Sequence, residues 1–378
     1  MQISLNSKGF IAITIGVIAM LGLAFFSAFG AADEGPAETK GGFALSPTGL
    51  LIAYHFSQPS TDGKTVLHGI RIHTIEGSTS HLIEGAENMH LHSPTFTPDH
   101  QSLIVASACW AKACPEKLHG SRIISINLAS GTWQVLTGDG LDEPFWDFGY
   151  VNETPESYQT QINRSHPVAT EDGIYYLMSA ASPRGVARAQ DFAPRHLSPN
   201  DGFLIRDNGG HVGFRGAGSL AAFGPDALLV MAGAARGGTA EETARQTKTF
   251  AYLLDKQDGT ILQSWGAADL EKLGITRPPS TESATGNPSS AIGYFAAGTD
   301  IIALAPSGPQ VFLSANTDTL RIWDLALSGD GRVLLEVSQM PGSGIPALSY
   351  SLINTTSKDR RNFKLNFTTT PMNIIKIQ

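Results

Sequence analysis

The chain has 378 residues, of which 16 % are charged, and its formal net charge is −8. This acidic balance excludes the basic surface that nucleic-acid binding requires, and it disfavours adsorption to anionic lipid. Apolar residues make up 42 % of the chain, which is enough for a packed core, while 40 glycines and 21 prolines are typical of many short strands joined by tight turns. We therefore expect an all-β protein with no nucleic-acid partner.

The N-terminal part is a candidate export segment, because residues 10–32 contain no charged side chain and follow Lys8. Two interpretations remain open: a signal peptide cleaved before Asp33, or an uncleaved transmembrane anchor, since about 20 apolar residues span a bilayer. We favour the anchor because the apolar run is longer than the roughly 7 to 15 residues of a usual signal-peptide core. In both cases the positive-inside rule exports everything that follows.

Three segments are expected. Residues 1–32 form the signal peptide or signal-anchor helix, residues 33–42 (DEGPAETKGG) form a short flexible linker, and residues 43–378 form the folded domain. The folded domain would lie in the periplasm or another extracytoplasmic part of the cell envelope. Residues 10–32 would be the only part to contact a membrane, as an anchor in the inner membrane.

A four-stranded unit is clearest at residues 93–137. It begins with a short strand, a tight turn at residues 97–100 (TPDH) and an apolar strand at residues 103–106. Apolar and polar residues then alternate, and a second turn leads to a last strand at residues 132–137. Four such strands in a row form an antiparallel meander, which is the blade of a β-propeller.

The same order of strand, tight turn and strand recurs near residues 43, 166, 220 and 303. Some of the spacings match the period of roughly 40 to 50 residues that is typical of propeller blades, and the longer ones carry insertions. The tail provides about three further strands, which we expect to complete a sixth blade by pairing with the N-terminal end. The sequence thus predicts a single β-propeller of four-stranded antiparallel blades, six in number, with seven as the alternative.

These units resemble the TolB-like, WD-repeat-like propellers of the bacterial cell envelope. The resemblance is carried by the turns SPTG at 46–49, TPDH at 97–100 and GPDA at 224–227, and by PSG at 306–308. The run RIWDL at 321–325 is similar to the third strand of a WD repeat, although the companion Gly-His dipeptide is missing. The resemblance implies a propeller in the cell envelope and says little about its ligand, because such propellers bind proteins, peptides or sugars.

The two faces of such a propeller differ in loop length. Connections between strands one and two and between strands three and four emerge on one face, and these are short here. Connections between strands two and three and between blades emerge on the other face and include the long stretches 108–120, 138–165, 179–200 and 233–248. Long loops on a rigid scaffold often carry binding residues, so we expect the long-loop face to contact a partner.

Two groups on that face are candidate binding residues. Trp146 lies between carboxylates, with Asp142 and Glu143, in the first large insertion, where the aromatic ring can either anchor a partner or fill the insertion. His90 and His92 lie before the second unit, spaced so that an extended chain points both to the same side. Such a pair can ligate a metal ion, but no third ligand is identifiable, so we expect hydrogen-bonded histidines, no metal and no cofactor.

The chain has two cysteines, Cys109 and Cys114, which flank four residues at the tip of a hairpin. Outside the cytoplasm, two nearby cysteines usually pair, so we expect a disulfide.

The common enzyme motifs are missing: the sequence has no Gly-x-Ser-x-Gly, His-Glu-x-x-His, Walker or dinucleotide-binding pattern. We therefore expect a non-enzymatic module of the cell envelope that binds a protein or peptide. One alternative is an enzyme, a lyase or hydrolase with its site at the channel mouth, which convergent carboxylates or histidines around the channel would favour. Another is a structural component of an envelope assembly.

Overall fold

The computed structural model describes most of the chain after residue 41. The described residues are 42–59, 66–75, 79–86, 89–109, 114–137, 162–180, 191–197, 202–204, 214–215, 217–232, 249–257, 259–277, 279–280, 283–314, 321–340, 348–365 and 373–378. The expected export segment and nearly all of the expected linker lie outside these ranges. Within them, no helix combines the length and the apolar character needed to cross a bilayer.

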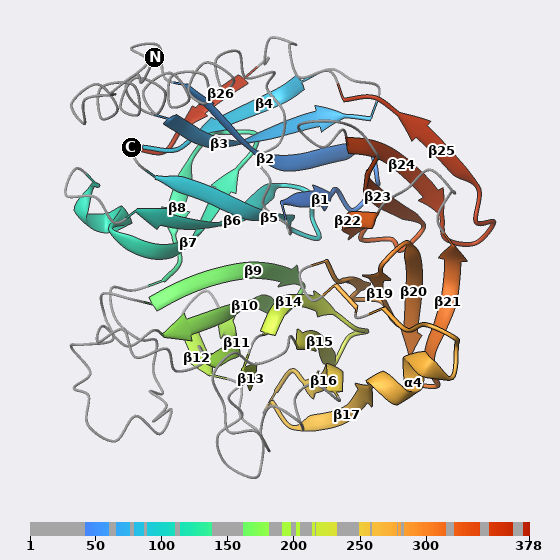
Figure 1. Ribbon diagram of the computed structural model, residues 1–378. Coiled ribbons are helices and arrows are strands. Elements are labelled where there is room, and N and C mark those ends of the chain that lie inside the picture. The colour runs from blue at the N-terminus through green and yellow to red at the C-terminus, as the bar shows by residue number, and fades with distance from the viewer. Residues whose placement is uncertain are drawn as a thin grey trace, which may run out of the picture.

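The described strands form six sheets that follow one another around a ring (Figure 1). The first sheet contains β1 (Phe43–Leu45), β2 (Leu51–Pro59), β3 (Val66–Thr74), β4 (Thr79–Glu84) and β26 (Asn373–Lys376), and the second contains β5 (His90–Phe96), β6 (Ser102–Cys109), β7 (Gly120–Asn127) and β8 (Trp133–Val135). The third contains β9 (Ile162–Thr170), β10 (Gly173–Ala180), β11 (Asp191–Leu197), β12 (Gly202–Leu204) and β13 (Phe214–Arg215).

The remaining sheets each have four strands. The fourth contains β14 (Ala217–Ala222), β15 (Ala227–Ala232), β16 (Thr249–Asp255) and β17 (Ile261–Gly266), and the fifth contains β18 (Thr285–Asn287), β19 (Ser290–Ala297), β20 (Asp300–Ala305) and β21 (Gly308–Ser314). The sixth contains β22 (Arg321–Leu327), β23 (Val333–Gln339), β24 (Leu348–Asn354) and β25 (Arg360–Phe363), and two short helices, η1 (Glu116–Leu118) and α4 (Ala267–Glu271), lie in connections.

The innermost strands close the ring. Each of β1, β5, β9, β14, β18 and β22 contacts the next, and β22 contacts β1. Within each sheet, neighbouring strands of the meander run antiparallel. The prediction of a single β-propeller with four-stranded antiparallel blades is therefore confirmed, and we refer to the six sheets as blades one to six.

Side chains from adjacent blades pack into a separate apolar cluster at each contact. Between blades one and two, for example, Ile70 and Ile83 meet Leu103 and Val105. Between blades four and five, Leu229 packs with the aromatic rings of Phe250 and Phe295. The alternation of apolar residues along each strand explains this arrangement, because a strand in the middle of a blade contacts one neighbouring blade with each face.

The blade boundaries in the C-terminal third differ from the prediction. Residues 303–315 were expected to open a blade, yet β20 and β21 are the third and fourth strands of blade five. The run at 321–325 belongs to β22, the first strand of blade six, and is not a third strand. The prediction was wrong because every hairpin of a meander has the same alternation and a similar tight turn, so hydrophobic pattern alone does not number the strands.

The closure of the ring also differs from the prediction. Blade six has four strands of its own, and the first described strand of the chain, β1, belongs to blade one. Instead β26 adds to the outer strand of blade one and runs parallel to β4, with Ile374 opposite Leu82. Ile375 and Ile377 are buried against blades one and two. The C-terminal strand therefore covers the edge of the first blade and seals its groove with the second.

Candidate functional site

A cavity of about 830 Å³ occupies the centre of the ring. Residues from the innermost strand of every blade line it, together with the turns that follow those strands. It opens on the face of the short turns, the face opposite the one where we expected binding. Its volume lies within the range of roughly 300 to 1,000 Å³ that is usual for ligand sites, which makes it the leading candidate site among the described residues.

The turns at the cavity mouth share one local design. In blades two, three and six a Ser or Thr hydroxyl donates to an aspartate two residues later: Thr97 to Asp99, Thr170 to Asp172 and Ser328 to Asp330, at 2.6, 2.5 and 2.6 Å. Backbone N–H groups complete two of these turns, from Gln101 to Asp99 and from Arg332 to Asp330. The hydrogen bonds from Thr97 and Gln101 hold the pKa of Asp99 below its usual value.

The cavity lining is strongly acidic. Its carboxylates are Glu171, Asp172, Asp226, Asp324 and Asp330, and among the described lining residues the one lysine or arginine is Lys256. Asp324 is buried and accepts hydrogen bonds from the backbone N–H groups of Phe43 and Leu325. Glu171 and Asp226, in contrast, are exposed at the mouth. The cavity therefore presents a negative field to solvent.

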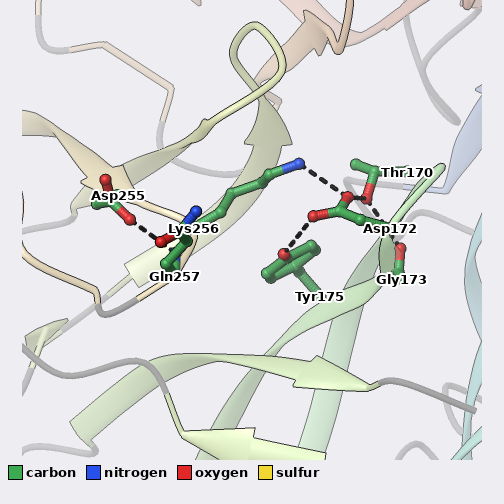
Figure 2. A network of polar contacts seen from close by, with 7 residues as sticks. All are labelled: Thr170, Asp172, Gly173, Tyr175, Asp255, Lys256 and Gln257. Carbon is green, nitrogen blue, oxygen red and sulfur yellow. Dashed lines mark hydrogen bonds and ion pairs between the residues drawn. The ribbon is translucent and has the colours of Figure 1, made fainter.

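Lys256 joins blade four to blade three at the cavity mouth (Figure 2). It lies in the turn after β16, its Nζ is 2.8 Å from the carboxylate of Asp172, and its side chain is only 8 % exposed. The Tyr175 hydroxyl donates to the same carboxylate at 3.1 Å. Burial opposes ionisation of Asp172, but the hydrogen bonds from Lys256 and Thr170 and the lysine charge outweigh it, so the pKa of Asp172 is lowered. The positive charge of Lys256 is thus paired with Asp172 within the protein.

Five histidines from blades one, two and three lie close together. We call them the histidine cluster: His55 of β2, His68 of β3, His90 and His92 of β5, and His166 of β9. The ring centroids of His55 and His68 are 5.6 Å apart, and those of His68 and His90 are 3.6 Å apart. His92 and His166 are close enough to interact electrostatically, and His166 itself lines the cavity.

Four of these histidines, His55, His68, His90 and His92, have lowered pKa values and are neutral at ordinary pH. Burial, followed by repulsion from other members, lowers the pKa of His55 to about 3 and that of His68 and His92 to about 4. Burial alone lowers the pKa of His90. His55 is only 4 % exposed, and neither of its ring nitrogens has a hydrogen-bond partner in the described structure. A proton on such a ring would be desolvated and would face other imidazoles.

The rings of the cluster are not all parallel. Those of His55 and His68 are stacked, with 10° between their planes, whereas those of His68 and His90 are tilted by 31°. The described residues contain no group of three or more His, Cys, Asp or Glu side chains placed to hold a metal.

One pair at the cavity resembles a nucleophile with its base. Ser93 lines the cavity, and its hydroxyl lies 3.1 Å from Nδ1 of His92. Ser93 also has a φ of 48°, but the same left-handed backbone recurs at His166, with a φ of 50°, and a proline follows both residues. The bend is therefore part of the repeat. A base whose pKa is about 4 accepts a serine proton poorly, so the pair gives little support to an enzyme.

The structure places two of the five predicted binding residues. His90 and His92 are the first and third residues of β5, opposite Ala108 and Ala106, and so point to the same side as expected. They were assigned to a connection between blades, which is wrong: β5 begins earlier because the irregularity before Thr95 absorbs Pro94 within the strand. Trp146, Asp142 and Glu143 lie outside the described residues, so their role stays a prediction.

The disulfide between Cys109 and Cys114 is confirmed. Both residues are buried, and they belong to the apolar cluster between blades one and two. The bond therefore closes the β6–β7 hairpin directly beside a blade contact.

No protein-family model and no curated protein sequence matches the chain. Among solved structures it is similar to TolB from Acinetobacter baumannii, with a TM-score of 0.45 and 13 % identity over 84 % of this chain and 64 % of that one. It is also similar to the β-propeller domain of the Trilobed protease from Pyrococcus furiosus, with a TM-score of 0.41 and 10 % identity over 85 % of this chain and 98 % of that one. A Pyrococcus horikoshii acylaminoacyl peptidase has a TM-score of 0.39 and 10 % identity.

The chain spans less than two thirds of that TolB chain and half of that peptidase chain. The assignment of the fold to this protein rests on its own strand order and on the closed ring of inner strands.

Proposed function

We propose that the chain is a non-enzymatic binding module that takes a cationic segment of a protein or peptide partner into the mouth of its central channel. The observation that supports this best is the charge of the cavity, where five carboxylates face one lysine that is already paired. Walls of low dielectric focus the field of such a cleft on the solvent in front of it. A segment that carries lysine or arginine would therefore be attracted to the mouth.

Two carboxylates are available for such a ligand. Glu171 and Asp226 are exposed, and neither side-chain carboxylate has a hydrogen bond or ion pair within the described structure. Asp99 and Asp330, in contrast, use their oxygens to hold their own turns. We infer that Glu171 and Asp226 supply most of the attraction and that the other carboxylates position the mouth.

The compartment is part of the proposal. A disulfide persists mainly in oxidising environments, and the Cys109–Cys114 bond therefore supports a location outside the cytoplasm. Export by residues 10–32, as a cleaved signal or an anchor, would bring the propeller to the cell envelope. The long-loop face, with Trp146, Asp142 and Glu143, stays a second predicted contact surface for the same partner.

A peptide titration tests the proposal. A labelled peptide of alternating lysine and alanine is expected to bind the full chain, and binding should weaken as salt is added. The double variant Glu171→Gln/Asp226→Asn should weaken binding by about three- to tenfold, because two partly exposed charge contacts are lost. Glu271→Gln removes an exposed carboxylate of α4, away from the cavity lining, and should leave binding unchanged.

Two results would overturn the proposal. One is equal binding of a peptide of alternating glutamate and alanine. The other is wild-type affinity in the double variant together with lost affinity in Trp146→Ala, which would move the site to the long-loop face.

A further inference from the structure

We propose that the histidine cluster makes the contact among blades one, two and three acid-labile, so that mild acid loosens this part of the ring while the other blades stay closed. The inference concerns the ring itself and does not depend on what the cavity binds. It is carried by the placement of five imidazoles from four strands in one cluster.

The strand pairing explains how the cluster forms. His68 lies opposite Ser57 of β2, so it shares a face with His55, two residues away, and that face is packed against blade two. His90 and His92 enter from β5 of blade two, and His166 enters from β9 of blade three. Neither blade one nor blade three can separate from blade two without disturbing contacts within the cluster.

The close approach of the rings requires that they be neutral. At a centroid separation of 3.6 Å, His68 and His90 would repel each other strongly if both were protonated. The ring nitrogens of His55 are buried without hydrogen-bond partners, so a proton there would lack both water and an acceptor.

The surrounding charges do not offset this. The charge interactions that lower the pKa of His55, His68 and His92 all come from other histidines of the cluster. The other charged side chains on these strands and their neighbours are Arg71 of β3, Arg122 of β7 and Arg164 of β9, all buried, and Glu84 of β4, which pairs with Lys376. Added positive charge on the cluster would therefore meet other imidazoles and no offsetting carboxylate among the described residues, since none of these charged side chains contributes to the lowered pKa values.

The direction of the effect follows from linkage. In an opened ring the histidines take up protons at their ordinary pKa of 6.5, whereas in the closed ring His68 and His92 resist protonation until about pH 4. The closed state is therefore fully favoured above pH 6.5 and loses stability as the pH falls toward 4. Since His166 and Ser93 line the cavity, loosening here would also change the channel wall.

Hydrogen exchange of the wild-type full chain tests this without a variant. After correction for the intrinsic rates, opening of β2, β3 and β5 should increase between about pH 7 and about pH 5 by up to about tenfold per pH unit for each histidine that takes up a proton. Opening of β19 and β20 in blade five should change far less. An equal change in all blades, or none in β2, β3 and β5, would overturn the proposal.

A double variant assigns the effect to the contact between His68 and His90. His68→Phe/His90→Phe keeps two flat rings in place but removes their protonation, and it should reduce the acid-induced opening of β3 and β5 by about tenfold or more. His119→Gln, at an exposed histidine outside the cluster, should behave as wild type. Wild-type acid sensitivity in the double variant would contradict the assignment of the opening to His68 and His90. If the double variant does not fold, the exchange pattern of the wild-type chain tests the proposal on its own.

Discussion

The contact between blades one and two differs from the contact between blades four and five in what fills it. Between blades four and five the filling is apolar and aromatic, with Phe250, Trp265 and Phe295 in one cluster. Between blades one and two, Val105 and its apolar neighbours share the space with a disulfide, an added C-terminal strand and the contact between the His68 and His90 rings. The blades have the same geometry in both places, but only the contact between blades one and two is expected to respond to pH and to reductant.

The largest effect is expected in the apolar contact. Phe295→Ala removes a fully buried ring from between blades four and five and should lower the free energy of unfolding by about 3 to 5 kcal/mol. Because no histidine belongs to this cluster, the loss should be the same at about pH 7 and about pH 5 in urea denaturation. Val311→Ala, at a residue that is 41 % exposed, serves as the control and should have little effect. If the loss of unfolding free energy in Phe295→Ala depends on pH, the contact between blades four and five is not insensitive to pH and the comparison of the two contacts fails.

The apolar contacts follow from sequence pattern far better than the mixed one. The alternation in residues 122–128 predicts β7 and its two buried faces, and the turn at 97–100 predicts the hairpin of β5 and β6. In contrast, nothing local in the sequence indicates that β26 runs parallel to β4, because that pairing joins chain segments almost 300 residues apart and rests on only four paired positions.

The second effect concerns the added strand. Ile377→Ala removes a fully buried side chain from the seal between blades one and two and should cost about 2 to 4 kcal/mol. It should also release β26, so hydrogen exchange at β4 should become faster while exchange at β20 stays as in wild type. Ile374→Ala, within β26 and 55 % exposed, is the matched control. If both variants behave alike, β26 does not seal the groove.

A smaller effect is expected for the disulfide. Replacing Cys109 and Cys114 together by alanine should destabilise the fold by about 2 kcal/mol, because closing so short a loop removes little chain entropy. Thermal unfolding with and without reductant gives the same comparison in the wild-type chain. A loss above about 4 kcal/mol would show that the two buried sulfurs matter through packing in the cluster rather than through the crosslink.

The smallest effect is expected where blade three meets blade four at the cavity mouth. Lys256→Gln removes the ion pair with Asp172, whose carboxylate side chain is 52 % exposed, so the cost should be about 1 kcal/mol or less. Since the pKa of Asp172 is lowered from 3.8, the pair contributes above that pH and is lost only below it. Lys256→Gln should therefore leave the stability profile between about pH 5 and about pH 7 unchanged in shape, which separates this ion pair from the histidines.

The candidate site was predicted only in part. The pair His90 and His92, separated by one residue, is visible in the sequence, but His55, His68 and His166 join it only through strand pairing and blade order. The repeated proline after Ser93 and after His166, each followed by a Thr-x-Asp turn, was the available signal for the cavity wall. Loop length pointed to the opposite face, because the long loops lie there. The cavity is formed instead by inner strands and short turns from all six blades.

The most direct test of the central claim is hydrogen exchange of the full chain with and without the saturating lysine–alanine peptide. Binding in the channel mouth predicts protection of the turns around Thr97, Asp172 and Asp226, which lie in three different blades. It also predicts no added protection in residues 138–161. Protection confined to residues 138–161, with the three turns unchanged, would contradict the account and place the binding site around Trp146.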